Sequence, residues 1–208
     1  MGDIEAVPHL APALTARDTA SRPDGLLIVM AGLPATGKTS LGVALCAACD
    51  AVLLSKDEIR AAAFPPKVID YSAAQDDLAM EMLYSATRYI FGKIPSARVI
   101  VDGRTFTKGR HVARVVGVAA DIGVRVRFVE CVCDDLSVRA RLAESVGERS
   151  HIAGNRDWRL YERLRAQAEP LQVERVVVDT GKLSVKEATQ ICVKYLFGQR
   201  DGGQLACP

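Results

Sequence analysis

The sequence predicts an α/β domain built around a parallel β-sheet. Short apolar runs alternate with helical patterns between residues 25 and 197, which is typical of successive βαβ units. Three of these runs, at residues 26–31, 99–101 and 175–178, are almost continuously apolar, as expected for strands that are covered on both faces. The chain has 208 residues, of which 49% are hydrophobic, and this is enough for one sizeable core. We expect a flexible arm over residues 1–24, one domain over residues 25–197 and a tail over residues 198–208.

Five strands are predicted, in the order 26–31, 51–54, 99–101, 124–131 and 175–178. In the fourth, valine and phenylalanine alternate with Arg125 and Arg127, so that strand should have one face near solvent.

The helices between these strands have recognisable ends. An apolar stripe follows Lys38, and another precedes Gly123, which should end its helix. Ser72 with Gln75, and Ser184 with Glu187, have the spacing of a capping box at a helix start.

Composition excludes several classes of protein. No apolar run approaches the ~18 residues needed to cross a bilayer. The N-terminus lacks the basic region of a secretory signal, so we expect a cytoplasmic protein without a membrane partner. The net charge of +2 gives no strong indication of a nucleic-acid partner. The six cysteines are interpreted as small buried side chains rather than as a zinc site.

A phosphate-binding loop follows the first strand directly. Its sequence, GLPATGKT, has the spacing GxxxxGKT in the strand–loop–helix context that this motif requires. The glycines let backbone N–H groups face phosphate oxygens, and the helix N-terminus favours an anion. The residues predicted to bind ATP are Gly32, Leu33, Pro34, Ala35, Thr36, Gly37, Lys38, Thr39 and Ser40. Within this set, Lys38 should reach the β- and γ-phosphates and the Thr39 hydroxyl should bind Mg²⁺.

The rest of the chain favours a kinase among the many users of such a loop. The guanine-reading motif NKxD of a GTPase is missing. After the third strand, Asp102 is followed by Gly103 rather than by the second acidic residue usual in motor and AAA+ ATPases. The small size and the single loop favour a kinase of the nucleotide-kinase type.

The acceptor of the phosphoryl group should bind beyond the second strand. Asp57 lies just after this strand, and ligands of open α/β sheets bind beyond the carboxyl ends of the strands. A kinase needs a carboxylate to take the proton of the acceptor hydroxyl, and Asp57 is our candidate for this base. Arg60, one helical turn later, is the candidate substrate clamp. Alternatively, Asp57 caps the short helix that runs through Ala63.

Further site residues are expected after the third strand. Asp102 should hold Mg²⁺ through water, with a solvated loop acid as the alternative. Arg104 and Thr105 lie beside it and are candidates for contact with the acceptor.

An arginine-rich lid is expected over about residues 145–157. This segment lacks periodicity and joins two helices, as a lid would. Arg149 is the candidate that stabilises transition-state charge, with Arg141 and Arg156 in reserve. The alternative for each arginine is a place on a solvated surface.

Four segments together resemble the polynucleotide-kinase-like branch of P-loop kinases, which includes zeta-toxin-type kinases. They are GLPATGKT, SKDEIR, VIVDGRTF and VVVDT. The resemblance implies a three-layer fold with sheet order 2-3-1-4-5, ATP as donor, Asp57 as general base and an arginine-bearing helical lid. Nucleic-acid kinases of this branch often have Asp-x-Thr-Asn where this chain has Asp102-Gly103-Arg104-Thr105, and this departure disfavours a polynucleotide acceptor.

Three functional hypotheses follow. The leading one is an ATP- and Mg²⁺-dependent kinase that phosphorylates a hydroxyl of a small metabolite. The second is a kinase of polynucleotide 5′-hydroxyls or of tRNA-linked groups, which would need a basic channel. The third is a regulatory switch in which ATP orders the lid for a partner, and such a switch would not need Asp57.

Overall fold

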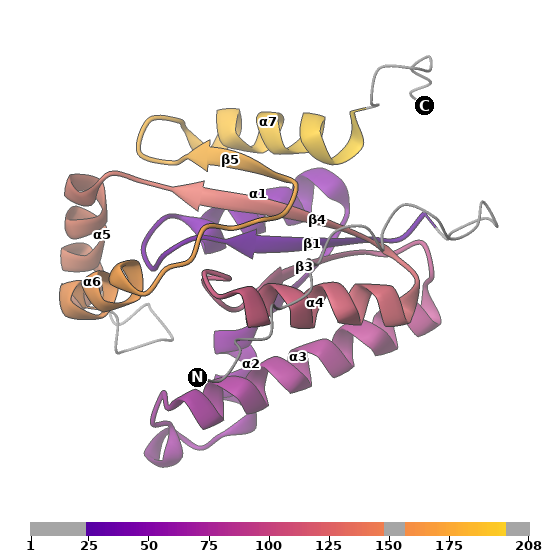
Figure 1. Ribbon diagram of the computed structural model, residues 1–208, viewed down its shortest axis with the longest axis horizontal. Helices are drawn as coiled ribbons and strands as arrows, with labels where there is room; N and C mark the ends of the chain where they lie inside the picture. The colour runs from indigo at the N-terminus through magenta and orange to yellow at the C-terminus, as the bar shows by residue number, and fades with distance from the viewer. Residues whose placement is uncertain (1–23, 148–156, 199–208) are drawn as a thin grey trace, which may run out of the picture.

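Five parallel strands form a single sheet in the order β2-β3-β1-β4-β5 (Figure 1). The computed structural model describes residues 24–147 and 157–198. The strands are β1 (Leu26–Ala31), β2 (Val52–Ser55), β3 (Arg98–Asp102), β4 (Arg125–Val132) and β5 (Arg175–Asp179). The sheet order implied by the family resemblance is thereby confirmed, and the strand ends differ from the predicted ones by one residue at most.

Helices cover both faces of the sheet. They are α1 (Lys38–Cys49), α2 (Lys56–Ala63), α3 (Ala73–Lys93), α4 (Gly109–Ile122), α5 (Asp135–Gly147), α6 (Trp158–Ala166) and α7 (Val185–Phe197), with a 3-10 turn η1 (Pro66–Val68). Helices α1 and α7 pack together over one face, and α3 and α4 pack over the other (Figure 1). No helix of the described residues is both long and apolar enough to cross a bilayer.

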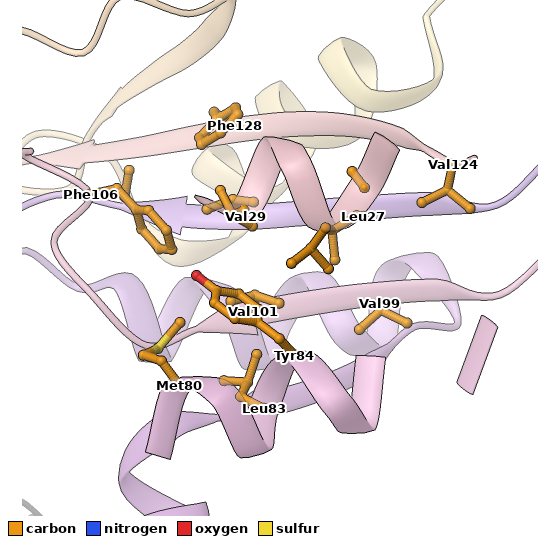
Figure 2. Close-up of a cluster of buried hydrophobic side chains, with 14 of the residues drawn as sticks. Leu27, Val29, Met80, Leu83, Tyr84, Val99, Val101, Phe106, Val124 and Phe128 are labelled. Carbon is orange, nitrogen blue, oxygen red and sulfur yellow. The ribbon is translucent and has the colours of Figure 1, made fainter. Parts of the chain in front are cut away.

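Two apolar cores lie above and below the sheet because successive strand residues point to opposite faces. Leu27 and Val29 of β1 pack with Leu83 and Tyr84 of α3 and with Phe128 of β4 (Figure 2). Ile28 and Met30 face the other core, together with residues of α1 and α7. Every residue of β1 is buried, as its apolar sequence predicts. The central strand is therefore a rigid support for the loop that follows it.

The fifth strand differs from its prediction. It lies at the edge of the sheet, and Val177 is 51% exposed, so this strand is not covered on both faces as its apolar sequence suggested. The fourth strand lies inside the sheet. There Arg125 is exposed as expected, whereas Arg127 is half-buried with its guanidinium over the ring of Tyr195.

Helix ends follow the predicted capping residues closely. Ser184 and Glu187 form the complete capping box, and Gly123 ends α4 in the left-handed conformation. Ser72 does cap α3, but the Gln75 side chain accepts from the N–H groups of Asp70 and Tyr71 instead of that of Ser72, so the second half of that box is wrong.

The cysteines within the described residues are small core side chains or lie at its margin. Cys49, Cys131 and Cys192 are buried in the core beneath α1 and α7. Burial raises the pKa of the Cys192 thiol to about 12 and that of Cys131 to about 11, so both stay protonated at neutral pH.

Candidate active site

The phosphate-binding loop between β1 and α1 needs glycine at its first position. Gly32 has a φ of +128°, and a side chain there would collide with the carbonyl oxygen of Cys131 on the neighbouring strand. The Gly32 N–H donates to the carbonyl of Thr105 at 2.9 Å. The loop is thus held between the ends of β3 and β4. Thr105, predicted to touch the acceptor, makes this contact with the loop.

Two side chains of the loop donate hydrogen bonds to a carbonyl within the same loop. Lys38 Nζ donates to the carbonyl of Leu33 at 2.7 Å, and Thr36 Oγ1 donates to the same carbonyl at 2.8 Å. Lys38 must leave this carbonyl to reach a phosphate, whereas Thr36, which is buried, can keep it.

Arg141 and Thr180 hold the outer side of the loop. Arg141 donates to the carbonyl of Ala35 at 3.2 Å, and to the hydroxyl and carbonyl of Thr180 at 3.0 and 2.7 Å. Thr180 Oγ1 in turn donates to the carbonyl of Thr36 at 2.9 Å. Because the peptide bond is planar and trans, the N–H of Gly37 then points the opposite way, as a phosphate site requires. We call Arg141 and Thr180 the outer clamp.

Helix α5, which carries Arg141 of the outer clamp, contacts the loop through apolar side chains. Val138 and Leu142 of α5 pack with Leu33 and Ala35 of the loop and with Tyr161 of α6. Trp158 stacks on Tyr161 with ring centroids 5.0 Å apart, so these aromatic rings pack within the helical layer. Arg149 and Arg156, together with most of the predicted lid, lie outside the described residues.

Thr39 and Asp102 form a pair of oxygen ligands suited to a magnesium ion. Thr39 Oγ1 donates to Asp102 Oδ2 at 2.6 Å, which joins the first turn of α1 to the end of β3. Mg²⁺ prefers oxygen ligands and usually keeps several waters, so it needs few protein groups. The described residues contain no group of three or more His, Cys, Asp or Glu side chains that could hold a metal. The Thr39–Asp102 pair therefore fits a magnesium ion that also binds phosphate, better than an ion held by protein alone.

Asp57 follows β2, the strand that pairs with the strand of Asp102. Ser55 of β2 pairs in register with Asp102 of β3, and Asp57 follows two residues later in the first turn of α2. The N-cap of α2 is Ser55, whose hydroxyl accepts from the N–H of Glu58. The alternative that Asp57 caps this helix is therefore wrong.

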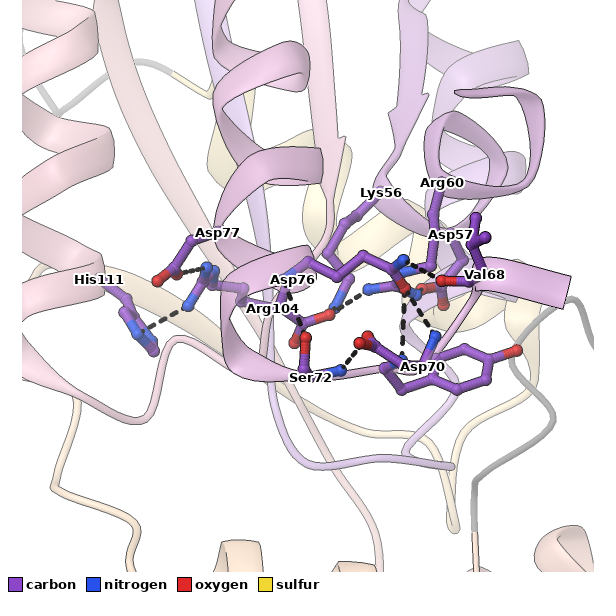
Figure 3. Close-up of polar contacts among 12 residues, drawn as sticks. Lys56, Asp57, Arg60, Val68, Asp70, Ser72, Asp76, Asp77, Arg104 and His111 are labelled. Atoms are coloured by element: carbon purple, nitrogen blue, oxygen red, sulfur yellow. Dashed lines mark hydrogen bonds and ion pairs between the residues drawn. The ribbon is translucent and has the colours of Figure 1, made fainter. Parts of the chain in front are cut away.

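A buried ion network surrounds Asp57 (Figure 3). Arg60 Nη1 donates to Asp57 Oδ1 at 2.6 Å, and Arg60 Nη2 donates to Asp76 of α3. Lys56 also binds Asp76, at 2.9 Å, and burial lowers the pKa of this lysine. Arg60 is only 2% exposed, and its guanidinium lies over the ring of Tyr71. These contacts make Arg60 a neighbour that fixes the Asp57 carboxylate, and its predicted role as a substrate clamp stays a prediction.

Arg104 points away from this network toward α4. Its guanidinium donates to His111 Nε2 at 2.8 Å and to Asp77 of α3 (Figure 3). Consecutive residues of α3 thus serve two clusters, since Asp76 binds Arg60 and Lys56 while Asp77 binds Arg104. Sequence reasoning missed these two aspartates, His111 and Thr180. The paired Asp76-Asp77 was the available signal for the first two.

The outer clamp gives a testable prediction. Thr180→Val keeps the shape of the side chain but removes the donor to the Thr36 carbonyl and one acceptor of Arg141. Each hydrogen bond contributes about 0.5–1.5 kcal/mol, so ATP affinity should fall roughly two- to tenfold by calorimetry. Thr189→Val is the control, because Thr189 Oγ1 donates to the carbonyl of Val185 within its own helix α7. Equal affinities in the two variants would contradict a role for the clamp.

Comparison with known proteins places this geometry in a family. The family model described as an AAA domain matches residues 27–171, which is more than half of the chain. The search of curated proteins found no match.

Solved structures share the fold at low sequence identity. A proposed kinase from Chloroflexus aurantiacus is 22% identical, with a TM-score of 0.67 over 85% of this chain and 100% of its own. The APS kinase CysC of Mycobacterium tuberculosis, solved with AMPPNP and APS, is 17% identical, with a TM-score of 0.60 over 84% and 98% of the two chains. A gluconokinase from Sinorhizobium meliloti is 18% identical, with a TM-score of 0.55 over 85% and 95%. At these identities the likeness establishes the fold and not the reaction. By its family match and its phosphate loop, the chain belongs to the AAA-domain family of P-loop proteins.

Proposed function

We propose that the protein is an ATP-dependent kinase that transfers the γ-phosphoryl group to a hydroxyl of a small metabolite. The observation that carries this proposal is the arrangement of Thr39, Asp102 and Asp57 at one edge of the sheet, beside the phosphate loop. A protein that only binds nucleotide needs the first two. The carboxylate of Asp57 beside them supplies what a phosphoryl acceptor requires, a base for its hydroxyl proton.

Each residue has a defined task in this reaction. Lys38 exchanges the Leu33 carbonyl for the phosphates of ATP, and the backbone held by the outer clamp faces their oxygens. Thr39 and Asp102 would hold Mg²⁺, which neutralises developing charge on the phosphates when it is bound. Asp57 Oδ1 is oriented by Arg60, and the carboxylate takes the proton of the attacking hydroxyl. The substrate-binding role of Arg104 and the charge-stabilising role of Arg149, with Arg141 and Arg156 in reserve, remain part of the proposal.

The solved neighbours support a small acceptor over a polynucleotide. Two of them are named as kinases of small molecules, APS kinase and gluconokinase, and both cover more than four fifths of this chain. The net charge of +2 also gives no strong indication of a nucleic-acid partner.

The decisive experiment is a screen for acceptor-dependent release of ADP. Small hydroxyl compounds and 5′-hydroxyl oligonucleotides are offered in parallel with ATP and Mg²⁺, and Lys38→Ala serves as the inactive control. We expect at least one small compound, and no oligonucleotide, to stimulate ADP release. Stimulation by oligonucleotides alone would reject the small-metabolite acceptor and support a kinase of polynucleotide 5′-hydroxyls. ATP binding with no stimulation by any acceptor would favour the regulatory switch.

A further inference from the structure

A cavity of about 270 Å³ lies between α3 and α4, beside the chain that leaves β3. Arg104, His111 and Arg114 line it together with Asp77, Glu81 and Tyr84. This volume is near the lower limit of small-molecule sites, so it suits one end of a small ligand. Arg104 follows Asp102 by two residues, a span of at most about 7 Å of extended chain. The Arg104 side chain points toward α4, so a ligand on its guanidinium must extend back along this side chain to bring another of its groups to the Thr39–Asp102 pair.

Two ion pairs balance the charges on the cavity wall. Arg114 binds Glu81 with two nitrogens, at 3.0 and 2.6 Å, and Arg104 binds Asp77. The side chain of Asp77 is 69% exposed whereas that of Arg104 is 12% exposed, so the pair is open to solvent on the side of its carboxylate. Arg104 can accordingly give up this carboxylate for one carried by a ligand.

Further positive charge surrounds the cavity at the start of α4. Lys108 and Arg110 precede His111 by three residues and one residue, and among the described residues neither of them forms an ion pair. The acidic residues on the wall are matched by its arginines. Lys108 and Arg110 add two positive charges, and the carboxylate of Glu169, which accepts from the N–H of Gly109 at 2.7 Å, offsets one of them, so an excess of one positive charge remains near the cavity. Such an excess attracts an anion into a partly enclosed site.

His111 accepts a hydrogen bond from Arg104, and its pKa responds to the positive charges around the cavity. Guanidinium groups only donate, so the contact of 2.8 Å from Arg104 requires a lone pair on His111 Nε2 and a neutral ring with its proton on Nδ1. That Nδ1 is buried with no hydrogen-bond partner among the described residues. Burial, followed by the charges of Arg104, Arg110 and Lys108, lowers the pKa of His111 to about 4, while Asp77 opposes this shift. The buried Nδ1–H of His111 thus has no acceptor among the described residues, while its Nε2 orients Arg104 along the cavity.

We infer that the cavity between α3 and α4 binds an anionic group, a carboxylate or a phosphate, on the compound that receives the phosphoryl group, with Arg104 as its direct partner. This inference rests on the proposed kinase function and narrows its acceptor to small hydroxyl compounds that carry such an anion. A neutral polyol would leave the excess positive charge unmatched and would bind more weakly.

The test uses His111 itself as the reporter. The chain has three histidines, so the C2 proton of His111 can be assigned in an NMR spectrum by its loss in His111→Asn. The His111 pKa is measured in inorganic phosphate, in glycolate and in chloride at equal ionic strength. An anion beside the ring favours its charged form, so the pKa should rise by roughly 1–3 units in phosphate or glycolate. Whichever probe gives the larger rise identifies the preferred anion.

Two variants locate the bound anion. Lys38→Ala disables the phosphate loop and should preserve the rise in the His111 pKa, whereas the double variant Lys108→Ala, Arg110→Ala should reduce it. Arg125→Ala, Lys194→Ala removes two exposed charges elsewhere and is the matched control. A His111 pKa that is equal in all three salts, or a rise that disappears in Lys38→Ala, would overturn the inference.

A parallel assay separates this inference from the proposed function. Glycerate and glycerol are compared as acceptors for ADP release, and the anionic member should give the faster turnover. A faster reaction with glycerol would reject the anionic acceptor and leave the kinase intact. A raised His111 pKa without turnover for any acceptor would retain the anion site and reject the kinase.

Discussion

Replacing Lys38 with alanine should lower the affinity for ATP roughly ten- to hundredfold, because a hydrogen bond between charged groups contributes about 1.5–3 kcal/mol. The fold should survive, since the Leu33 carbonyl keeps its bond of 2.8 Å from Thr36 Oγ1 when the lysine is lost. Calorimetry with ATP, with and without Mg²⁺, measures the change. The wild-type protein should also lose affinity without Mg²⁺, through Thr39 and Asp102.

A second lysine provides the control for this variant. Lys194 is exposed in the last turn of α7, so Lys194→Ala removes the same charge away from the loop. Its ATP affinity should match that of the wild type. If a folded Lys38→Ala protein binds ATP as tightly as Lys194→Ala, the loop does not bind phosphate in the way we assign to it.

The sheet was predictable because its signals are local. Continuous apolar runs, capping residues and the glycine after α4 each act within a few residues, and their positions agree with the structure to about one residue. The fifth strand shows where local signals end. Val176, Val177 and Val178 look like a central strand, but only the arrangement of the other strands places them at the sheet edge, where Val177 is exposed.

The candidate site likewise contains residues that the sequence predicts and residues that only the fold brings together. The phosphate loop and its threonine form one contiguous motif, so their positions follow from the sequence alone. Thr180 binds Thr36 across 144 residues, and Arg141 reaches Ala35 across 106, so no spacing rule connects them. Asp76 of α3 looks like an ordinary acidic residue in the first turn of a helix. Its role appears only when Lys56 and Arg60 are brought against it.

Replacing Asp57 with asparagine should reduce acceptor-dependent turnover by about 10²–10⁴-fold, the usual contribution of a general base. Asparagine keeps an oxygen that can accept from Arg60 but cannot take the hydroxyl proton. ATP affinity should be nearly unchanged, because Asp57 belongs to α2 and its carboxylate is paired with Arg60 of the same helix. The effect therefore separates an enzyme from a protein that only binds nucleotide.

The stability of this variant needs its own measurement, because Arg60 is buried. In Asp57→Asn, Arg60 retains the charge of Asp76, so the free energy of unfolding should fall by only about 1–2 kcal/mol. Glu58→Gln is the matched control, since it makes the same chemical change at the next, exposed position of the same helical turn.

Three measurements on both variants decide the role of Asp57: ADP release with an identified acceptor, ATP affinity and thermal unfolding. A selective loss of turnover in Asp57→Asn, with Glu58→Gln active, identifies Asp57 as the base. Turnover near that of the wild type would reject Asp57 and direct attention to Asp102, which lies beside Ser55 on the neighbouring strand. If turnover and folding are lost together, Asp57 acts as a counter-ion of the buried Arg60, and Asp76 alone does not compensate this charge.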